Sequence, residues 1–443
     1  MALSGMFDSG WLYRAPALDE IVSEIRDERR GRKKIAVVIP NYKNPSILHT
    51  HLSRLSAQTF KDFDVITVLG QDDRPPEGGF GFSSLYLRRK LDIGSAGAFY
   101  AGERRAFEDG YEVIVLADDD CLPESADLLE TLVSGVRKNK VAKAKLLVSS
   151  ARLRPRVLAQ YGAVSRDVFE RCGFSFLPFY SGAEDVELEM RMRSQGIETE
   201  HIVGGIASHP ITPSFLFWPR YKLYHYFRNA GLFFSQTGSV LFMNLTVLCQ
   251  LLLAAGLASI GRYDAGFMIL RALFGICTAG YFKGGFSERG GMIATEAKRI
   301  EDGAVPPARR PPEYIEMDIP CGFLLPSRKK RAEGPRWKAL LAYSRDVVRQ
   351  IAALAGNFGK RIAYPEMQDD LGLLAILFSR SAWGYHRDRP HYIVKDRCLP
   401  AITFGLALFV LLSVPSIILT PFLSCIAMAM HRMRGISTDR YGL

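Results

Sequence analysis

The stretch of sequence that decides the fold is Glu112-Val113-Ile114-Val115-Leu116-Ala117-Asp118-Asp119-Asp120. Its apolar part predicts a short buried strand, and three consecutive acids follow at the end of that strand. Carboxylates held this close repel one another unless a cation lies among them. A hard divalent cation takes oxygen ligands, so the acid triplet Asp118–Asp120 predicts a Mg²⁺ or Mn²⁺ site that also grips substrate phosphates. Taken alone, such a triplet is more often a solvated acidic turn; the neighbouring motifs favour the metal site.

Apolar strands and amphipathic helices alternate along the first half of the chain. This alternation predicts βαβ units and an α/β fold with a mainly parallel sheet. Ligands gather at the carboxyl ends of such strands, so Pro40-Asn41, Asp72-Asp73 and Asp118–Asp120 are predicted to face one crevice. The expected strands are 35–40, 65–70, 85–91 and 113–116, and the expected helices are 46–57 and 94–107.

The bulk composition narrows the class of function. The chain has 443 residues, and 57 Lys and Arg against 46 Asp and Glu give a net charge of +11. A basic balance suits nucleic acid, a nucleotide diphosphate or an anionic membrane face as partner. The basic residues are spread while acids crowd the expected crevice, which argues against nucleic acid. Seven cysteines without a Cys-x-x-Cys pair argue against a zinc site and for a reducing compartment. The polar, acid-containing N-terminus does not predict a signal peptide.

The second half of the chain is more apolar. Uncharged stretches run from Val240 to Ile260 and from Leu399 to Met430, and about 20 apolar residues can cross a bilayer core. The first stretch fits a buried core helix as well as a membrane span. We expect the second to lie in the membrane, as one helix kinked at its prolines or as a re-entrant hairpin. The expected divisions are a polar arm at 1–33, an α/β domain at 34–235, a helical apolar region at 236–300, a Pro- and charge-rich linker at 301–336, and a helical region at 337–443 that contains the membrane segment 399–430.

Two further motifs carry groups suited to acid–base or metal chemistry. Glu184-Asp185 follow a turn at Gly182 and open an expected helix. A carboxylate in that place stays ionised, as a general base must, although the pair is also simply a favourable helix start. His209 precedes Pro210 and is either an ordinary turn residue or a nitrogen ligand that completes the metal site of the acid triplet.

The remaining motifs are rich in glycine or in aromatic and basic residues. The segment Gly94–Gly102 contains Gly94 and Gly97, whose lack of a side chain allows close approach to a substrate or tight helix packing. Its spacing does not match the dinucleotide-binding fingerprint. The segment Tyr221–Asn229 has the pattern of core aromatics on one helix face, but its Arg228 offers a fork that suits phosphate.

In this order, the motifs resemble a known family: inverting glycosyltransferases of family 2 with the GT-A fold. Within it they are most similar to galactofuranosyltransferases and rhamnosyltransferases. The resemblance covers roughly residues 35–235, about half of the chain. It rests on Val38-Ile39-Pro40-Asn41-Tyr42, Asp72-Asp73, Gly94–Gly102, Asp118-Asp119-Asp120, Glu184-Asp185, His209 and Tyr226-Phe227-Arg228-Asn229.

The resemblance implies a role for each of these residues. Pro40 and one of the two acids at 72–73 would line the nucleotide base and ribose. The family usually has an Asp-Asp-Gly/Ser turn here, but Arg74-Pro75-Pro76 follow the pair, so either acid can be the nucleotide contact. The donor contacts would be Pro40, Asn41, Asp72, Asp73, Gly94, Gly97, Asp119 and Arg228. Asp118, Asp120 and His209 would hold Mn²⁺ or Mg²⁺ on the donor diphosphate, and Asp185 would be the catalytic base, with Glu184 as the second candidate.

The sequence therefore predicts a glycosyltransferase with a GT-A domain and a helical, membrane-associated C-terminal region. It would move a sugar from a UDP-galactofuranose or dTDP-rhamnose type of donor to a lipid-linked glycan acceptor, at the cytoplasmic face of the cell membrane. A metal-dependent nucleotidyltransferase is an alternative, but it does not need a carboxylate and histidine set such as Asp185 and His209. A non-catalytic membrane scaffold is another, and the intact acids argue against it.

Overall fold

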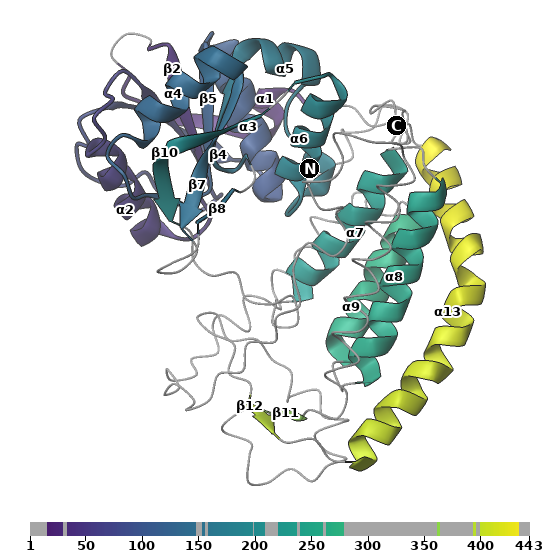
Figure 1. The fold of residues 1–443 in the computed structure, drawn as a ribbon. Helices are drawn as coiled ribbons and strands as arrows, with labels where there is room; N and C mark the ends of the chain where they lie inside the picture. Colours follow the sequence, from purple (N-terminus) through teal and green to yellow (C-terminus); the bar gives the residue numbers. More distant parts are fainter. Residues whose placement is uncertain are drawn as a thin grey trace. The chain divides into compact units, whose positions relative to one another are not determined.

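The computed structural model describes two separate units of the chain (Figure 1). The α/β unit lies within Arg14–Thr212 and the helical unit within Pro213–Thr438. The described residues are 16–29, 33–147, 153–155, 158–197, 199–208, 220–236, 240–259, 263–278, 361–363, 393–395 and 399–433. The expected linker at 301–336 and His209 lie outside them.

A single sheet forms the centre of the α/β unit. Its strands are β1 (Val22–Asp27), β2 (Ile35–Pro40), β3 (Asp64–Leu69), β4 (Ser83–Arg89), β5 (Val113–Ala117), β6 (Leu122–Pro123), β7 (Val141–Leu147), β8 (Leu153–Pro155), β9 (Gln160–Ser165) and β10 (Glu200–Ser208). Among the described residues they make a ten-stranded sheet in the order β1-β4-β3-β2-β5-β9-β7-β10-β6, with β8 beside β7. Neighbours from β4 to β5 are parallel, as are β7 and β10, and the flanking strands pair antiparallel. The expected mixed α/β architecture with a parallel centre is confirmed.

Helices cover both faces of the parallel strands. Helices α2 (Pro45–Ser56) and α4 (Leu128–Asn139) share one core with alternate strand residues such as Val37. Helix α3 (Gly94–Glu108) packs on the other face, where a Cβ at Gly102 would lie 2.3 Å from Val38 Cγ1. Burial on both faces explains why the sequence of β2 is a continuous apolar run. The shorter helices are α1 (Leu18–Ile21), α5 (Arg166–Cys172), η3 (Leu177–Phe179) and α6 (Glu184–Ser194).

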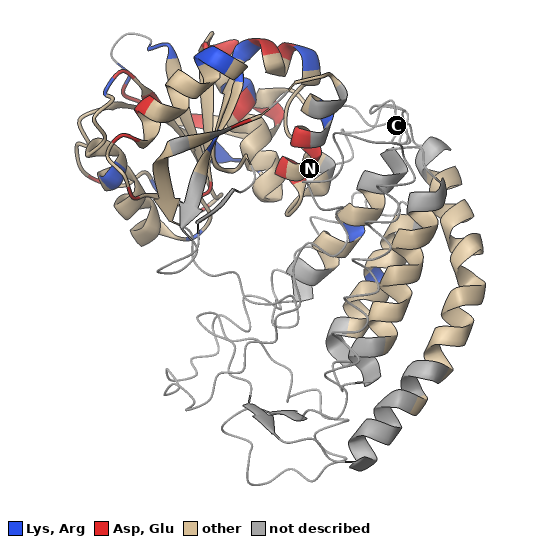
Figure 2. Ribbon diagram, in the orientation of Figure 1, with Lys and Arg blue, Asp and Glu red and all other residues tan. Residues whose placement is uncertain are grey.

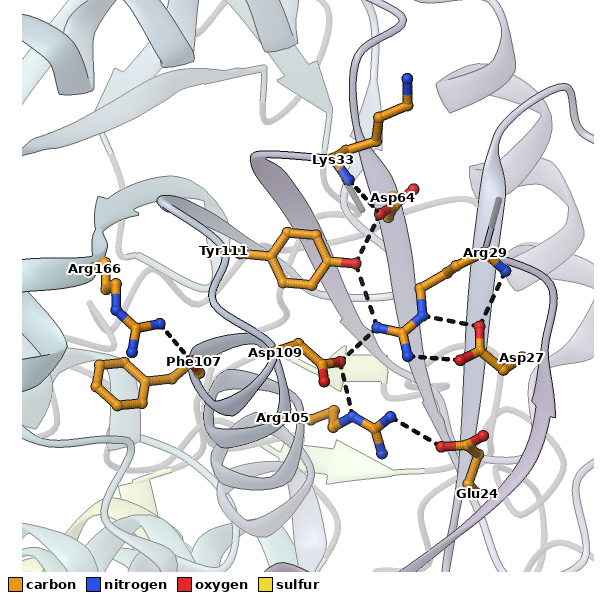
Figure 3. Close-up of polar contacts among 10 residues, drawn as sticks. All are labelled: Glu24, Asp27, Arg29, Lys33, Asp64, Arg105, Phe107, Asp109, Tyr111 and Arg166. Carbon is orange, nitrogen blue, oxygen red and sulfur yellow. Dashed lines mark hydrogen bonds and ion pairs between the residues drawn. The ribbon is translucent and has the colours of Figure 1, made fainter. Parts of the chain in front are cut away.

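The segment expected as a polar arm contributes the edge strand β1, which pairs antiparallel with β4. A network of ion pairs anchors the end of this strand (Figure 3). The guanidinium of Arg29 pairs with Asp27 at 2.6 Å and also with Asp109. Arg105 pairs with Asp109 at 2.8 Å and with Glu24 at 3.0 Å. Asp109 precedes β5, so the network lies at the amino ends of the parallel strands and its role is to hold the edge strand.

The described part of the helical unit contains four long helices: α7 (Arg220–Gln236), α8 (Val240–Ser259), α9 (Tyr263–Thr278) and α13 (Leu399–Met433). The strands β11 (Arg361–Ala363) and β12 (Ile393–Lys395) form a separate antiparallel two-stranded sheet. Helix α8 contacts the other three helices, and its Met243 and Val247 share a core with Ile276 and Ala427. Helix α8, within the first uncharged stretch, therefore packs as a core helix of this unit. Figure 2 shows few charged residues on the described parts of these helices.

Helix α13 runs without a break through Pro415 and Pro421, so the uncharged stretch 399–430 is one helix, curved in Figure 1, and not a hairpin. Its segment Leu411–Met430 is long and apolar enough to cross a membrane. Much of it faces outward, with 69% of Leu411 and 65% of Phe422 exposed. Length and composition qualify this helix as a candidate span.

The boundary between the units lies at Thr212, whereas the sequence placed the end of the α/β domain at 235. Helix α7 packs against α8 and α9 and so belongs to the helical unit. Among its described contacts, the Phe227 carbonyl accepts a hydrogen bond from Gln250 of α8 at 2.8 Å.

Candidate active site

The parallel strands bring the loops of the predicted site to one edge of the sheet. Strand β2 pairs in parallel with β3 on one side and with β5 on the other. The loops that begin at Asn41, Gly70 and Asp118 therefore start at the same edge. The side chains that these three loops bring close together decide which chemistry is possible at this edge.

The acid triplet is held in a defined backbone turn after β5. The amide of Asp118 donates to the carbonyl of Ala159 at 2.6 Å, and the amide of Cys121 donates to the carbonyl of Asp118 at 3.1 Å. Burial raises the pKa of Asp118 well above its usual value, and repulsion from Asp120 and then Asp185 raises it further. The structure thus brings acids from β5 and α6 into one electrostatic cluster.

The side chain of Asp119 is turned toward the loop after β2. Asn41, itself buried, donates from Nδ2 to Asp119 Oδ2 at 2.9 Å. Burial and the charge of Asp120 raise the pKa of Asp119 to about 7, although the hydrogen bonds from the Tyr42 backbone and Asn41 lower it. Asp119 is thus bound to protein groups through its side chain.

Helix α6 presents the second pair of acids after a strained loop. Tyr180 and Ala183 adopt positive φ angles of 60° and 70°, which are unfavourable for residues with a Cβ and recur at functional sites. Glu184 Oε1 accepts a hydrogen bond from Ser95 Oγ at 2.6 Å. Burial and the neighbouring Asp185 raise the pKa of Glu184 to about 7. Asp185 Oδ1 accepts from the Val186 amide at 2.7 Å, in the first turn of the helix.

The two glycines predicted to contact the donor are buried against protein. A Cβ at Gly94 would lie 1.9 Å from the carbonyl oxygen of Tyr180, and φ at Gly94 is +65°. A Cβ at Gly97 would lie 2.4 Å from the Cβ of Ile93. Close packing of α3 against the loop before α6 accounts for Gly94, and packing against the Ile93 side chain at the start of α3 accounts for Gly97. The first contact also positions the Ser95 hydroxyl beside Glu184.

The structure distinguishes the two acids that follow β3. Asp73 Oδ2 accepts hydrogen bonds from the amides of Lys43 at 2.9 Å and Gly70 at 3.0 Å. Asp73 therefore ties the loop after β3 to the loop after β2. Asp72 is exposed, which leaves its carboxylate open to a ligand. Pro40, predicted to line the nucleotide, is buried at the end of β2.

Two residues at this edge were not predicted as site residues. Buried Arg89 donates to three carbonyls, those of Leu69 at 3.2 Å, Asn41 at 3.3 Å and Gly94 at 3.3 Å, and so links the loops after β2 and β3 to the start of α3. Its guanidinium lies 5.1 Å from the ring centre of Tyr42, whose side chain is 47% exposed. An arginine at a strand end gives no distinctive sequence signal, whereas the exposed Tyr42 directly follows the Pro40-Asn41 motif.

The carboxylate oxygens of the acid cluster are the kind of ligand that a hard divalent cation prefers. The cluster is partly buried and its carboxylates repel one another, and a cation with oxygen ligands would relieve that repulsion. Within the described part of the chain, no group of three or more His, Cys, Asp or Glu side chains is arranged to hold an ion. The predicted third ligand, His209, lies outside the described residues, so the ligand set Asp118, Asp120 and His209 stays a prediction.

Arg228 is placed in the helical unit, on α7. It is fully buried and donates from Nη2 to Asn229 Oδ1 at 2.7 Å. Its guanidinium also lies 5.8 Å from the ring centre of Tyr224. These contacts give Arg228 a packing role within its own unit, and its contact with the donor diphosphate stays a prediction.

The chain has partial similarity to curated galactofuranosyltransferases, although no family model matches it. It is 29% identical over 117 residues to galactofuranosyltransferase GlfT1 of Mycolicibacterium smegmatis, which covers 26% of this chain and 39% of that protein. It is also 29% identical over 121 residues to GlfT1 of Mycobacterium tuberculosis, covering 26% and 40%. The chain thus spans about two fifths of the length of these relatives.

Solved structures with similar folds include S. aureus TarS in complex with UDP, at a TM-score of 0.35 and 13% identity, covering 48% of this chain and 65% of that one. Another is the mannosyltransferase PcManGT from Pyrobaculum calidifontis in complex with GDP-Man and Mn²⁺, at a TM-score of 0.37 and 12% identity, covering 75% and 89%. These scores are low, so the fold is taken from the sheet order of the chain itself.

Proposed function

We propose that this protein is an inverting, metal-dependent glycosyltransferase. It transfers a sugar from a nucleotide-diphosphate donor, of the UDP-galactofuranose or dTDP-rhamnose type, to a lipid-linked glycan at the cytoplasmic face of the cell membrane. One observation carries the proposal: acids that follow β5 and acids that open α6, far apart in sequence, form one electrostatic cluster at the carboxyl edge of a parallel sheet. Partial similarity to the GlfT1 galactofuranosyltransferases supports the same activity.

The donor nucleotide is assigned to the loops after β2 and β3. The half-exposed ring of Tyr42 offers a surface on which a base can stack. The carboxylate of exposed Asp72 can accept hydrogen bonds from base or ribose. Arg89 holds the backbone of these loops, which keeps both contacts in place before the donor binds.

A Mn²⁺ or Mg²⁺ ion would be held by Asp118 and Asp120, with His209 as the predicted nitrogen ligand. When bound, it would neutralise the charge of the donor diphosphate. Asp119 stays with Asn41 and orients the triplet.

The base is assigned to Asp185, which would take the proton from the acceptor hydroxyl as that oxygen attacks the anomeric carbon from the face opposite the leaving group. A single displacement of this kind inverts the anomeric centre. Glu184 is less suited to the role, because its Oε1 is engaged by Ser95 and its pKa of about 7 leaves much of it protonated near neutral pH.

A membrane-bound acceptor is supported by the outer surface of the helical unit. Large apolar side chains of α9 and α13 are exposed, among them Phe274 at 68% and Ile418 at 61%. A contiguous apolar surface of this kind marks a membrane or protein contact. The excess of basic residues in the chain favours anionic lipid.

The proposed function is tested with purified full-length protein in detergent. A panel of nucleotide sugars is added with Mn²⁺, and both thermal stabilisation and release of the nucleoside diphosphate are measured, with Asp120→Asn as the control. We expect one class of nucleotide sugar to stabilise the wild-type protein and to be consumed. Consumption of nucleoside triphosphates with release of pyrophosphate, and no response to nucleotide sugars, would instead identify a nucleotidyltransferase.

A further inference from the structure

A buried histidine lies directly behind the acid triplet. His51, on α2, is fully buried and contacts two groups through its ring nitrogens. Nδ1 lies 3.1 Å from the carbonyl oxygen of Asp119, and Nε2 forms a short hydrogen bond with the hydroxyl of Tyr161. Nothing in the proposed chemistry uses this imidazole, and a buried polar ring needs a reason to replace an apolar one.

The two contacts define the proton arrangement of His51. A carbonyl oxygen can only accept, so Nδ1 carries the proton and donates it to Asp119. Burial lowers the pKa of His51 to about 4, so the ring is neutral near neutral pH and Nε2 is an acceptor. The Tyr161 hydroxyl therefore donates to Nε2. The result is a chain of hydrogen bonds, directed from Tyr161 through His51 to the backbone of the acid triplet.

The tyrosine that starts this chain has a strained backbone. Tyr161 has a φ of 63°, and the pairing of β5 with β9 shifts register beside it, between Leu116 and Ala117. Bulges next to active sites commonly re-aim a side chain. A left-handed conformation at a bulky residue persists only where surrounding contacts impose it. Next to it, a Cβ at Gly162 would lie 2.6 Å from the Leu158 carbonyl oxygen, so this turn accepts only glycine there.

The same turn also holds the triplet at its other end. Ala159, two residues before Tyr161, accepts the hydrogen bond from the amide of Asp118 at 2.6 Å. The turn thus holds Asp118 directly, by the hydrogen bond to Ala159, and holds Asp119 indirectly, by the hydrogen bonds of Tyr161 and His51. Both bonds are made by backbone atoms of the triplet and do not involve the carboxylates of Asp118 and Asp120.

We propose that His51 and Tyr161 are positioning residues that fix the backbone of the acid triplet, and through it the directions of the Asp118 and Asp120 carboxylates. The purpose of this positioning, the binding of metal and donor, rests on the proposed function. The positioning itself is a property of the backbone and can be measured without any substrate.

The test compares three variants with a control on the same helix. His51→Leu removes both hydrogen bonds, and Tyr161→Phe removes the hydroxyl. His51→Asn places an amide N–H close to the position of Nδ1 and keeps the contact with Asp119. The control is Leu52→Ala, which opens a cavity in the apolar core and has no hydrogen bond to the triplet.

Two readouts separate positioning from general stability. The first is hydrogen exchange at the Asp118 and Cys121 amides, compared at conditions of equal global stability. We expect faster exchange in His51→Leu and Tyr161→Phe than in Leu52→Ala, and recovery in His51→Asn. The second is Mn²⁺ binding in the presence of UDP, which we expect to weaken by about 10- to 100-fold in the first two variants, as for other groups that orient metal ligands.

The outcomes are distinguishable from failure of the proposed function. Exchange at both amides equal to that of Leu52→Ala would overturn the positioning role. Faster hydrogen exchange at these amides together with wild-type Mn²⁺ affinity would show that the positioning does not serve metal binding. If the wild-type protein bound neither Mn²⁺ nor UDP, the proposed function would fail, while the exchange data would still decide whether His51 and Tyr161 hold the triplet.

Discussion

Asp185, in the first turn of α6, lies close to Asp118, which directly follows β5. The charge of Asp185 raises the pKa of the Asp118 carboxyl. Two acids from distant parts of the sequence therefore share one site. In the proposed reaction they have different roles, because Asp118 serves the donor side and Asp185 the acceptor side. Each role can be tested by removing one charge at nearly constant volume.

We predict that Asp185→Asn lowers turnover by at least about 10²-fold, because the amide cannot accept the proton of the acceptor hydroxyl. Donor affinity should change little. The matched variant Glu184→Gln should keep more activity, since Glu184 is hydrogen-bonded to Ser95. Steady-state kinetics and donor binding are compared for both. Weakened donor binding with normal turnover at saturation would assign Asp185 to the donor side instead.

We predict that Asp120→Asn has opposite effects on stability and on activity. The charge of Asp120 repels both Asp118 and Asp119, so its removal should raise the melting temperature in EDTA. Loss of a ligand oxygen should abolish Mn²⁺-dependent donor binding. Differential scanning fluorimetry with and without Mn²⁺ and UDP measures both. Full transfer activity of the wild-type protein in EDTA would rule out a metal requirement.

We predict that the two acids after β3 have different roles: Asp72 contacts the donor, and Asp73 stabilises the loops. Asp72→Ala should raise the donor KM without changing the melting temperature, since Asp72 is exposed. Asp73→Ala should lower the free energy of unfolding by about 1–3 kcal/mol, because two backbone amides lose their acceptor. Thermal unfolding and donor titration are run on both variants. Normal donor affinity in Asp72→Ala would contradict the assignment.

The sequence predicted the parts of the fold that local pattern encodes. The apolar run Ile35–Pro40 identifies a strand, because a strand buried on both faces is a continuous apolar run. The acids that follow Val113–Ala117 identify the edge of the sheet where ligands are expected. The edge strand β1 was missed, because its sequence, Val22-Ser23-Glu24-Ile25-Arg26-Asp27, is largely polar and is held by ion pairs to residues far along the chain. Such long-range pairing leaves no local signal.

The candidate site was predictable to a similar depth. Acidic motifs at the ends of strands and helices are visible in a sequence, so Asp118 and Asp185 could be named as candidate residues in advance. The residues that support them could not be named: Arg89 and His51 contact backbone carbonyls, which any sequence supplies, and Tyr161 acts through its hydrogen bond with His51. The glycines Gly94 and Gly97 were recognised as special, but only the approach of the Tyr180 carbonyl shows that packing requires Gly94.

A pH prediction concerns Glu103, a buried carboxyl on α3 outside the acid cluster. It accepts hydrogen bonds from the amide and hydroxyl of Ser175 at 2.6 and 2.7 Å, yet burial raises its pKa from 4.5 to about 7. The folded state therefore binds this proton more tightly than the unfolded state. Its contribution to stability is largest below about pH 4.5 and is lost as the pH rises toward about 7.

Replacing Glu103 with glutamine should remove this pH dependence. The stability of wild type relative to Glu103→Gln should fall by up to about 3 kcal/mol between pH 4.5 and 7, and then level off. Urea unfolding across that range measures the difference. The control is Glu108→Gln on the same helix, whose side chain is 45% exposed and should show a much smaller change. A wild-type profile parallel to that of Glu103→Gln would show that Glu103 ionises normally.

The final prediction concerns the outer surface of α13. Ile418 and Phe422 are 61% and 65% exposed and lie within the segment long enough to cross a membrane. If lipid covers this face, each charge placed near its centre costs about 2.5–3.5 kcal/mol of insertion. We therefore expect the wild-type protein to fractionate with membranes and the double variant Ile418→Asp, Phe422→Asp to be released or degraded.

A matched charge elsewhere separates lipid from water at this face. Gln71→Asp adds a charge at an exposed position of the α/β unit and should leave fractionation unchanged. If water or another part of the chain covers α13 instead, the wild-type protein should stay in solution without detergent. Membrane fractionation that survives the double variant would place the attachment on other residues. Either result would remove the main support for a lipid-linked acceptor while leaving the acid cluster, and the transfer chemistry assigned to it, intact.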